Sequence, residues 1–378
     1  MKNCVISADS HFLEPPTLWQ ERLDRKYRDR APHTVVSKRR GIVLLVGEDI
    51  QAQPVSGWCA AGRAAEDAVK INTLGFDAAP PGVWTPEGRI KDQDRDGIAA
   101  EILYTSFGMV AMNIRDSELA MACMRVFNDY AAEFCSHDPK RLIGIGAVVP
   151  DDVEACVREM ERIGKLGLRG VMLPITLVEG ESYGNPKYDP IWAAAQEMDL
   201  VLSFHAGTSR AGINPRPEDW AQLYMSAHYM MQRPLTDVIV GGVFDRFPGL
   251  KLVSVENDVS WLPSYVERLE HFADRFVAVA SLRLKKRPTE YIRDHVFATF
   301  TFEGPGVDAV RRAFGCENIM WGNDYPHLDS SWPNSRELIQ RSLIDVLPPE
   351  DAENILCNNV ARLYELELPQ QAGLTAAE

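Results

Sequence analysis

A carboxylate and an imidazole stand two residues apart near the start of the chain, in the stretch Asp9-Ser10-His11. This stretch follows the apolar pair Val5-Ile6, which predicts a β-strand. Alternate residues of an extended segment point to the same side, so Asp9 and His11 can converge on one point. Carboxylate oxygen and imidazole nitrogen both bind divalent metal ions, and the pair therefore predicts part of a metal site. Taken alone, the same spacing is more often a surface Asp beside a His that caps a turn.

Four later polar residues stand at or just beyond the ends of apolar segments. They are His205 after residues 200–204, Glu256 after 252–255, Glu303 after 296–301, and Asp324 after 318–322. Each has a structural explanation of its own: a core histidine, an arginine-paired Glu, a loop residue, or an Asp that caps a turn. Five strand ends rarely carry such residues by chance, so the joint pattern has more weight. Histidines and carboxylates gathered in one cup predict a divalent-metal site of the hydrolase or oxygenase kind.

The elements that must position these residues follow a regular rhythm of strand and helix. Short apolar segments predict eight strands, at residues 3–8, 101–105, 142–149, 169–173, 200–205, 252–256, 296–301 and 318–322. Helical periodicity predicts helices at 117–134, 151–163, 190–198, 226–240, 261–276, 307–314, from 335 onward, and at 352–365. This order predicts an α/β fold, a (β/α)8 TIM barrel whose active site lies at the C-terminal ends of the strands. A doubly wound open sheet is the alternative, but it usually carries a Gly-rich turn after its first strand, and residues 9–12 contain no Gly.

Residues 12–95 show no clean alternation and predict a loop-rich insertion after the first strand. Within it, residues 34–37 and 42–46 predict a hairpin with Arg39-Arg40-Gly41 in the turn. Loops at the mouth of a scaffold often shape access to a site. We expect a single domain over residues 1–366 and a flexible tail over 367–378.

The composition narrows the class of partner. The 378 residues carry a formal net charge of −14, which argues against nucleic acid or an anionic membrane surface as a partner. The seven cysteines are scattered without C-x-x-C spacing, so a disulfide framework or zinc knot is not expected. The sequence shows neither a signal peptide nor an apolar run long enough to span a membrane. We expect a cytoplasmic protein whose partner is a small-molecule substrate.

Taken together, the motifs resemble the amidohydrolase superfamily, in its amidohydrolase-2 branch, which is similar to aminocarboxymuconate-semialdehyde decarboxylase. The resemblance covers nearly the whole chain. It is carried by Asp9-x-His11-x-x-Glu14-Pro15, Ser203-Phe204-His205, Gly242-Val243-Phe244-Asp245-Arg246-Phe247-Pro248-x-Leu250-Lys251, Glu256-Asn257-x-x-x-Trp261 and Trp321-Gly322-x-Asp324-Tyr325-Pro326-His327. The resemblance implies a distorted (β/α)8 barrel, and the family suggests a homodimer.

The resemblance also implies a ligand set. His11, His205 and Asp324 take the positions of metal ligands, and Asp9 falls where many relatives carry the first His or a Glu of the strand-one pair. Glu256 falls where the decarboxylases carry a His that serves the catalytic water or the substrate. No Lys stands in Val171-Met172-Leu173-Pro174, so the bridging carbamylated lysine of dinuclear relatives is absent.

These considerations assign each candidate residue a role. The expected metal ligands are Asp9, His11, His205, Glu256 and Asp324, around one Zn²⁺ or Mn²⁺ ion. A bound ion of this kind lowers the pKa of a water ligand toward 7. The expected catalytic residues are Asp324, Glu256 and His228, and the expected substrate-binding residues are His327, Arg210 and Glu303. An Arg can bind a substrate carboxylate through two parallel hydrogen bonds.

Three functions fit this set of residues. The first is a metal-dependent hydrolase or non-oxidative decarboxylase that acts on a small cyclic or aromatic carboxylic acid, ester, lactone or amide. The second is a non-haem di-iron oxygenase with two Fe on the same barrel, because the site is rich in carboxylates. The third, a binding protein without catalysis, is less favoured because the ligand set is intact.

Overall fold

The structure is a computed structural model that describes residues 4–38, 41–46, 50–76, 79–211, 219–280 and 282–367. The predicted turn residues Arg39 and Arg40 lie outside these ranges. The predicted tail also lies outside them, apart from Glu367. Among the described helices, none is both long and apolar enough to cross a bilayer.

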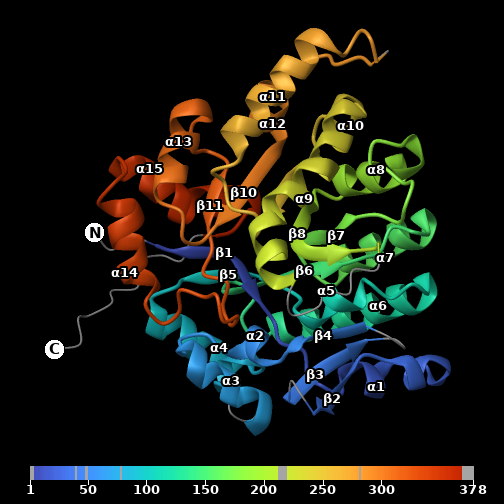
Figure 1. Cartoon of the computed structure of the whole chain (residues 1–378), viewed down its shortest axis with the longest axis vertical. Helices are drawn as coiled ribbons and strands as arrows, with labels where there is room; N and C mark the ends of the chain where they lie inside the picture. The colour runs from blue at the N-terminus through green and yellow to red at the C-terminus, as the bar shows by residue number, and fades with distance from the viewer. Residues whose placement is uncertain are drawn as a thin grey trace.

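Eight parallel strands form one curved sheet around the centre of the molecule (Figure 1), in the order β1-β5-β6-β7-β8-β9-β10-β11. They are β1 (Ile6–His11), β5 (Ala100–Tyr104), β6 (Leu142–Ala147), β7 (Gly170–Thr176), β8 (Val201–Ser209), β9 (Leu252–Val255), β10 (Val296–Phe300) and β11 (Ile319–Trp321). Nearly every strand residue is buried, as expected when helices cover a parallel sheet whose inner face is also filled. The predicted (β/α)8 barrel is confirmed.

Helices follow the strands and form the outer layer of the barrel (Figure 1). The longer ones are α6 (Ser117–Cys135), α7 (Val153–Lys165), α8 (Asp189–Glu197), α9 (Trp220–Val240), α11 (Leu262–Arg275) and α13 (Pro305–Phe314). Shorter ones are α5 (Phe107–Ala111), α10 (Val243–Arg246), α12 (Pro288–His295), α14 (Ser335–Ile339), α15 (Pro349–Glu353) and α16 (Asn359–Leu363). Asp116 and Asp152 begin α6 and α7, because each carboxylate accepts hydrogen bonds from backbone N–H groups in the first turn.

The barrel closes where β1 meets the segment that follows β11. Asp324 N–H donates to Asp9 O at 2.9 Å, and His11 N–H donates to Tyr325 O at 2.6 Å. Gly322 lies at this seam, and a Cβ atom there would stand 2.5 Å from Asp9 Cβ and 2.9 Å from Asp9 N. Only glycine allows the two backbones to approach this closely. The seam therefore fixes the start of the chain against its C-terminal third.

Strand β1 differs from the expected strand over residues 3–8, because it continues to His11. Asp9 and His11 therefore lie within the strand rather than after it. Between Ser7 and Ser10 the pairing with β5 shifts by one residue, so β1 carries an irregularity of the bulge kind. Bulges bend a strand and re-aim its side chains, and they occur often beside active sites.

The insertion between β1 and β5 contains more regular structure than the sequence predicted. The expected hairpin is confirmed as β2 (His33–Ser37) and β3 (Gly41–Val46), and β4 (Ile50–Pro54) adds a third antiparallel strand. Four helices were not predicted: α1 (Leu18–Arg22), α2 (Ser56–Cys59), α3 (Ala65–Leu74) and α4 (Pro86–Asp96). In the view of Figure 1 the insertion lies below β1 and β5, on one side of the barrel.

Candidate metal centre

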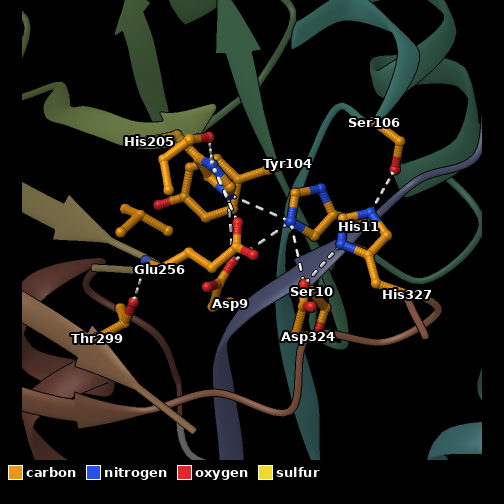
Figure 2. A network of polar contacts seen from close by, with 12 residues as sticks. Asp9, Ser10, His11, Tyr104, Ser106, His205, Glu256, Thr299, Asp324 and His327 are labelled. Carbon is orange, nitrogen blue, oxygen red and sulfur yellow. Dashed lines mark hydrogen bonds and ion pairs between the residues drawn. The ribbon is translucent and has the colours of Figure 1, made fainter. Parts of the chain in front are cut away.

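Three buried donor atoms converge on one point, two from Asp9 and His11 near the C-terminal end of β1 and one from His205 in β8 (Figure 2). His11 Nε2 lies 3.2 Å from His205 Nε2, and Asp9 Oδ1 lies 3.6 Å from His11 Nε2 and 3.5 Å from His205 Nε2. Donors bound at about 2.0–2.2 Å to one ion stand roughly 3.1–3.5 Å apart when they are neighbours in its shell. The three atoms therefore have nearly the spacing of ligands that share one cation.

The hydrogen bonds of the two imidazoles fix which nitrogen faces the centre. His11 Nδ1 lies 3.0 Å from Thr105 O, and His205 Nδ1 lies 2.9 Å from Ala206 O. A carbonyl oxygen only accepts, so each Nδ1 carries the hydrogen and each Nε2 presents a lone pair. Asp9 Oδ1 is buried and has no hydrogen-bond partner. Two lone pairs and an unpartnered carboxylate oxygen, all directed at one point, fit a bound cation and would repel one another without it.

Asp324 approaches the same centre from the seam beside β1. Its Oδ1 atom lies 3.4 Å from His11 Nε2 and 2.9 Å from His327 Nδ1, and it too is buried without a hydrogen-bond partner. Its backbone has a φ of 54°, a left-handed conformation that Asp adopts more readily than most residues. Burial, together with the nearby carboxylates of Glu256 and Asp9, raises the pKa of Asp324 well above its usual value. A cation at the centre would offset this crowding of negative charge.

His327 stands behind Asp324 and against the ring of His11, with ring centroids 4.0 Å apart. Its Nε2 atom lies 2.9 Å from Ser106 Oγ, and the Ser106 hydroxyl lies 2.6 Å from Phe12 O, to which it can donate. Together with Asp324 and His11, His327 forms a second group of donors close enough to hold an ion. Burial and the neighbouring His205 lower the pKa of His327 to about 3, which keeps its ring neutral.

Glu256 lies beside His205, and its carboxylate points toward the convergent donors (Figure 2). Its Oε2 atom is 3.5 Å from His205 Nδ1, and 37% of its side chain is exposed at the mouth of the barrel (Figure 2). Its φ of 57° is strained for a Glu, and its N–H donates to Thr299 Oγ1 at 3.0 Å. Burial of its inner part raises the pKa of Glu256 to about 8. Glu256 therefore borders the centre without belonging to either donor group.

Three other predicted site residues do not join the described donor groups. The Arg210 guanidinium binds Asp151 and the carbonyl oxygens of Met112 and Ile114, and its side chain is 1% exposed. Arg210 instead lines a separate cavity of about 530 Å³ beside the C-terminal ends of β7 and β8. Glu303 accepts hydrogen bonds from backbone N–H groups just before α11. His228 lies partly exposed on α9 and belongs to neither donor group.

Sequence reasoning gave no role to two buried residues that support His11. The Glu14 carboxylate accepts the Thr105 hydroxyl and the Phe107 N–H (2.9 Å), and so fixes the segment whose Thr105 carbonyl orients the His11 ring. Arg89, from α4 of the insertion, donates to His11 O at 2.5 Å and pairs with Glu101 at 3.1 Å. Glu14 belongs to the motif Asp9-x-His11-x-x-Glu14-Pro15, so its role near the site could have been predicted from the sequence. Arg89 belongs to no motif, and nothing in the sequence indicated a role for it.

Known proteins resemble this chain in sequence and in fold. The 2-amino-3-carboxymuconate-6-semialdehyde decarboxylase of Dictyostelium discoideum is 25% identical over 64% of this chain and 67% of its own. The crystal structure of an amidohydrolase from Mycobacterium avium subsp. paratuberculosis K-10 matches 96% of this chain and 100% of its own, with a TM-score of 0.80 and 22% identity.

A dihydroxybenzoic acid decarboxylase from Polaromonas sp. JS666, solved with bound manganese and the inhibitor 2-nitroresorcinol, also has the same fold. It matches 96% of this chain and 97% of its own, with a TM-score of 0.67 and 19% identity. The amidohydrolase family model matches residues 11–366, which is nearly the whole sequence. This chain therefore belongs to the amidohydrolase family.

Proposed function

We propose that this protein is a divalent-metal-dependent, non-oxidative decarboxylase of a small cyclic or aromatic carboxylic acid. The observation that carries the proposal is the convergence of Asp9 Oδ1, His11 Nε2 and His205 Nε2, 3.2–3.6 Å apart, with both Nδ1 atoms held by carbonyl groups. The type of reaction is taken from the two decarboxylases to which the chain is similar.

The residues that would hold the ion are Asp9, His11 and His205, with Asp324 as a further ligand beside His11. When bound there, a divalent ion supplies a Lewis acid that binds the substrate carboxylate and withdraws electron density from the ring. The mixed nitrogen and oxygen donors suit both Mn²⁺ and Zn²⁺. We favour Mn²⁺, since the Polaromonas decarboxylase binds manganese, and metal analysis of the purified protein tests this choice.

The chain itself must supply the proton that replaces the carboxylate. In the proposed reaction the ring C–C bond to the carboxylate breaks, CO₂ leaves, and a C–H bond forms at the same ring carbon. The Asp324 carboxyl is our candidate proton donor, because it is buried and borders the centre, and one of its oxygens can carry a proton while the other faces the ion. The proton that restores Asp324 must come from solvent, because the neutral His327 ring uses its one N–H on Ser106 Oγ and presents a lone pair at Nδ1, 2.9 Å from Asp324 Oδ1. Glu256 lies 3.5 Å from His205 Nδ1 at the mouth and can accept a hydrogen bond from a substrate hydroxyl.

Hydrolysis of an ester, lactone or amide is the second candidate. One observation favours it: Glu256 takes the position at which the decarboxylases are expected to carry a His, and its carboxylate can act as a base for an attacking water. In this case Asp324 would accept a proton from that water rather than donate one. The di-iron oxygenase considered from the sequence finds no support in the comparisons, and we do not propose it.

The experiment compares the two reactions on one preparation. The metal is removed with a chelator, the protein is reloaded with Mn²⁺ or Zn²⁺, and hydroxybenzoic acids are supplied under anaerobic conditions. We expect CO₂ release that depends on added metal and does not depend on oxygen. Hydrolysis of esters or lactones without CO₂ release from any acid would establish the second candidate, and a requirement for oxygen would refute both.

A further inference from the structure

His327 presents a nitrogen lone pair to which the proposed reaction gives no role. Its Nε2 atom lies 2.9 Å from Ser106 Oγ, and the Ser106 hydroxyl lies 2.6 Å from Phe12 O. A carbonyl oxygen only accepts, so the Ser106 hydrogen is directed at Phe12 O, and the Ser106 oxygen accepts the hydrogen of His327 Nε2. A neutral imidazole has a single N–H, so the Nδ1 atom of His327 carries a lone pair.

This lone pair faces other electron-rich atoms of the centre. Asp324 Oδ1 lies 2.9 Å from His327 Nδ1 and 3.4 Å from His11 Nε2, and it accepts no hydrogen bond from any described residue. A proton between Asp324 and His327 would satisfy this pair but would leave the lone pair of His11 Nε2 without a partner. A cation beside the three atoms, which lie within 4.8 Å of one another, would satisfy all of them.

The donor group of Asp324 and His327 shares His11 Nε2 with the donor group of Asp9 and His205. An imidazole nitrogen has one lone pair and binds one ion at a time. The two groups therefore cannot each hold an ion in full, and the donors of both are available to a single ion. Some atoms of one group lie more than 4.8 Å from atoms of the other, so side chains must turn toward the ion when it binds.

The neighbours of His327 hold its ring at the centre. Leu328 N–H donates to Gly57 O at 3.0 Å, which ties the loop after β11 to α2 of the insertion. Next to Gly57, the Trp58 ring packs edge-on against the His327 ring, with centroids 5.3 Å apart and planes at 80°. The His11 ring packs against His327 as well, with centroids 4.0 Å apart. A donor that is already oriented by packing loses little conformational freedom when it binds an ion.

We propose that His327 Nδ1 is a fifth protein ligand of the divalent ion, in addition to Asp9, His11, His205 and Asp324. This inference rests on the proposed function, because it assumes a divalent ion at the centre. Mn²⁺ favours about six ligands in an octahedral arrangement, so five from the chain leave about one position free. The substrate carboxylate then binds the ion through one of its two oxygens.

The ligands of bound Mn²⁺ can be counted without any turnover. Pulsed electron paramagnetic resonance of the Mn²⁺-loaded wild-type protein counts the imidazoles on the ion, and we expect those of His11, His205 and His327. The relaxation of water protons counts the water molecules on the ion. His327→Ala should raise that number by about one and lower the Mn²⁺ affinity at least about tenfold in competition with a chelator. His327→Asn should restore the wild-type number of waters, because its side-chain oxygen can take the place of Nδ1.

The matched control is His295→Ala. His295 is also buried, its Nδ1 atom lies 3.0 Å from the backbone oxygen of Leu250, and its Nε2 atom has no hydrogen-bond partner among the described residues. It ends α12 just before β10 and therefore lies at the N-terminal end of that strand, at the other end of the barrel from the centre. His295→Ala should change neither the number of waters nor the affinity for Mn²⁺.

Three results would overturn the assignment of His327. They are only two imidazoles on the ion in the wild-type protein, an unchanged number of waters in His327→Ala, and an extra water that His327→Asn does not remove. The proposed function fails separately from this assignment. The expected imidazole and water counts without CO₂ release from any hydroxybenzoate would keep His327 as a ligand and contradict the decarboxylase. CO₂ release with two imidazoles on the ion would keep the decarboxylase and remove His327 from the ligands.

Discussion

Replacing Gly322 with alanine tests the idea that the barrel seam positions the metal ligands. The new Cβ would stand 2.5 Å from Asp9 Cβ, 2.9 Å from Asp9 N and 3.1 Å from Asp9 Cα. Ordinary carbon–carbon contacts are about 3.5–4.0 Å, so the two segments must separate by about 1 Å. Metal ligands tolerate displacements of only about 0.2 Å. Asp9 Oδ1, now 3.5 Å from His205 Nε2, would therefore leave its position in the donor group.

Two measurements follow from this displacement. Overpacking at a buried site costs about 1–3 kcal/mol in the free energy of unfolding, which a denaturant titration of the metal-free protein measures. Disturbing the support of a ligand lowers metal affinity roughly 10–100-fold, which competition with a chelator measures. The matched control is Gly164→Ala on α7, where the new Cβ would meet only Met198 Sδ, at 3.9 Å. Wild-type metal affinity in Gly322→Ala would refute the reasoning, whatever its stability.

Three further substitutions test separate parts of the site. His205→Ala removes one of three convergent donors, so bound metal and activity should both be lost; elemental analysis that finds wild-type stoichiometry would exclude His205 as a ligand. Glu256→Gln should lower turnover at least tenfold while changing the free energy of unfolding by less than about 1 kcal/mol, and an unchanged rate would remove Glu256 from the catalytic site. Arg89→Met should cost about 3–5 kcal/mol, because it leaves the buried Glu101 carboxylate without its charged partner; a thermal melt like that of the wild type would contradict this.

The order of strands and helices could be predicted because it depends on local patterns. Buried parallel strands are short and apolar, and the helices between them repeat at 3.6 residues, so both kinds of segment are visible without knowledge of their neighbours. Boundaries were less accurate. β1 ends at His11 instead of residue 8, and β8 ends at Ser209 instead of residue 205. Strand ends depend on the adjacent strands, because a residue counts as part of a strand only while a neighbour pairs with it.

The insertion between β1 and β5 also shows that elements without a clear local pattern cannot be predicted from the sequence. The hairpin of β2 and β3 was visible as two apolar runs around a turn, whereas α3 and α4 were not predicted. α4 contains many charged residues, and its inward face buries polar side chains, among them Arg89 and Gln93. A polar helix of this kind lacks the apolar stripe by which an amphipathic helix is recognised.

The sequence by itself determined which residue types reach the C-terminal ends of the strands, and it thereby identified Asp9, His11, His205 and Asp324 as neighbours in space. It could not determine which group each polar side chain would hydrogen-bond to in the folded protein. From the sequence, Arg210 was a loop arginine that could bind a substrate carboxylate. In the folded protein its guanidinium is already hydrogen-bonded to Asp151 and to two backbone carbonyl groups. Residue type and spacing are properties of the local chain, whereas the partner of a buried polar group depends on segments distant in sequence, and only the tertiary structure brings these together.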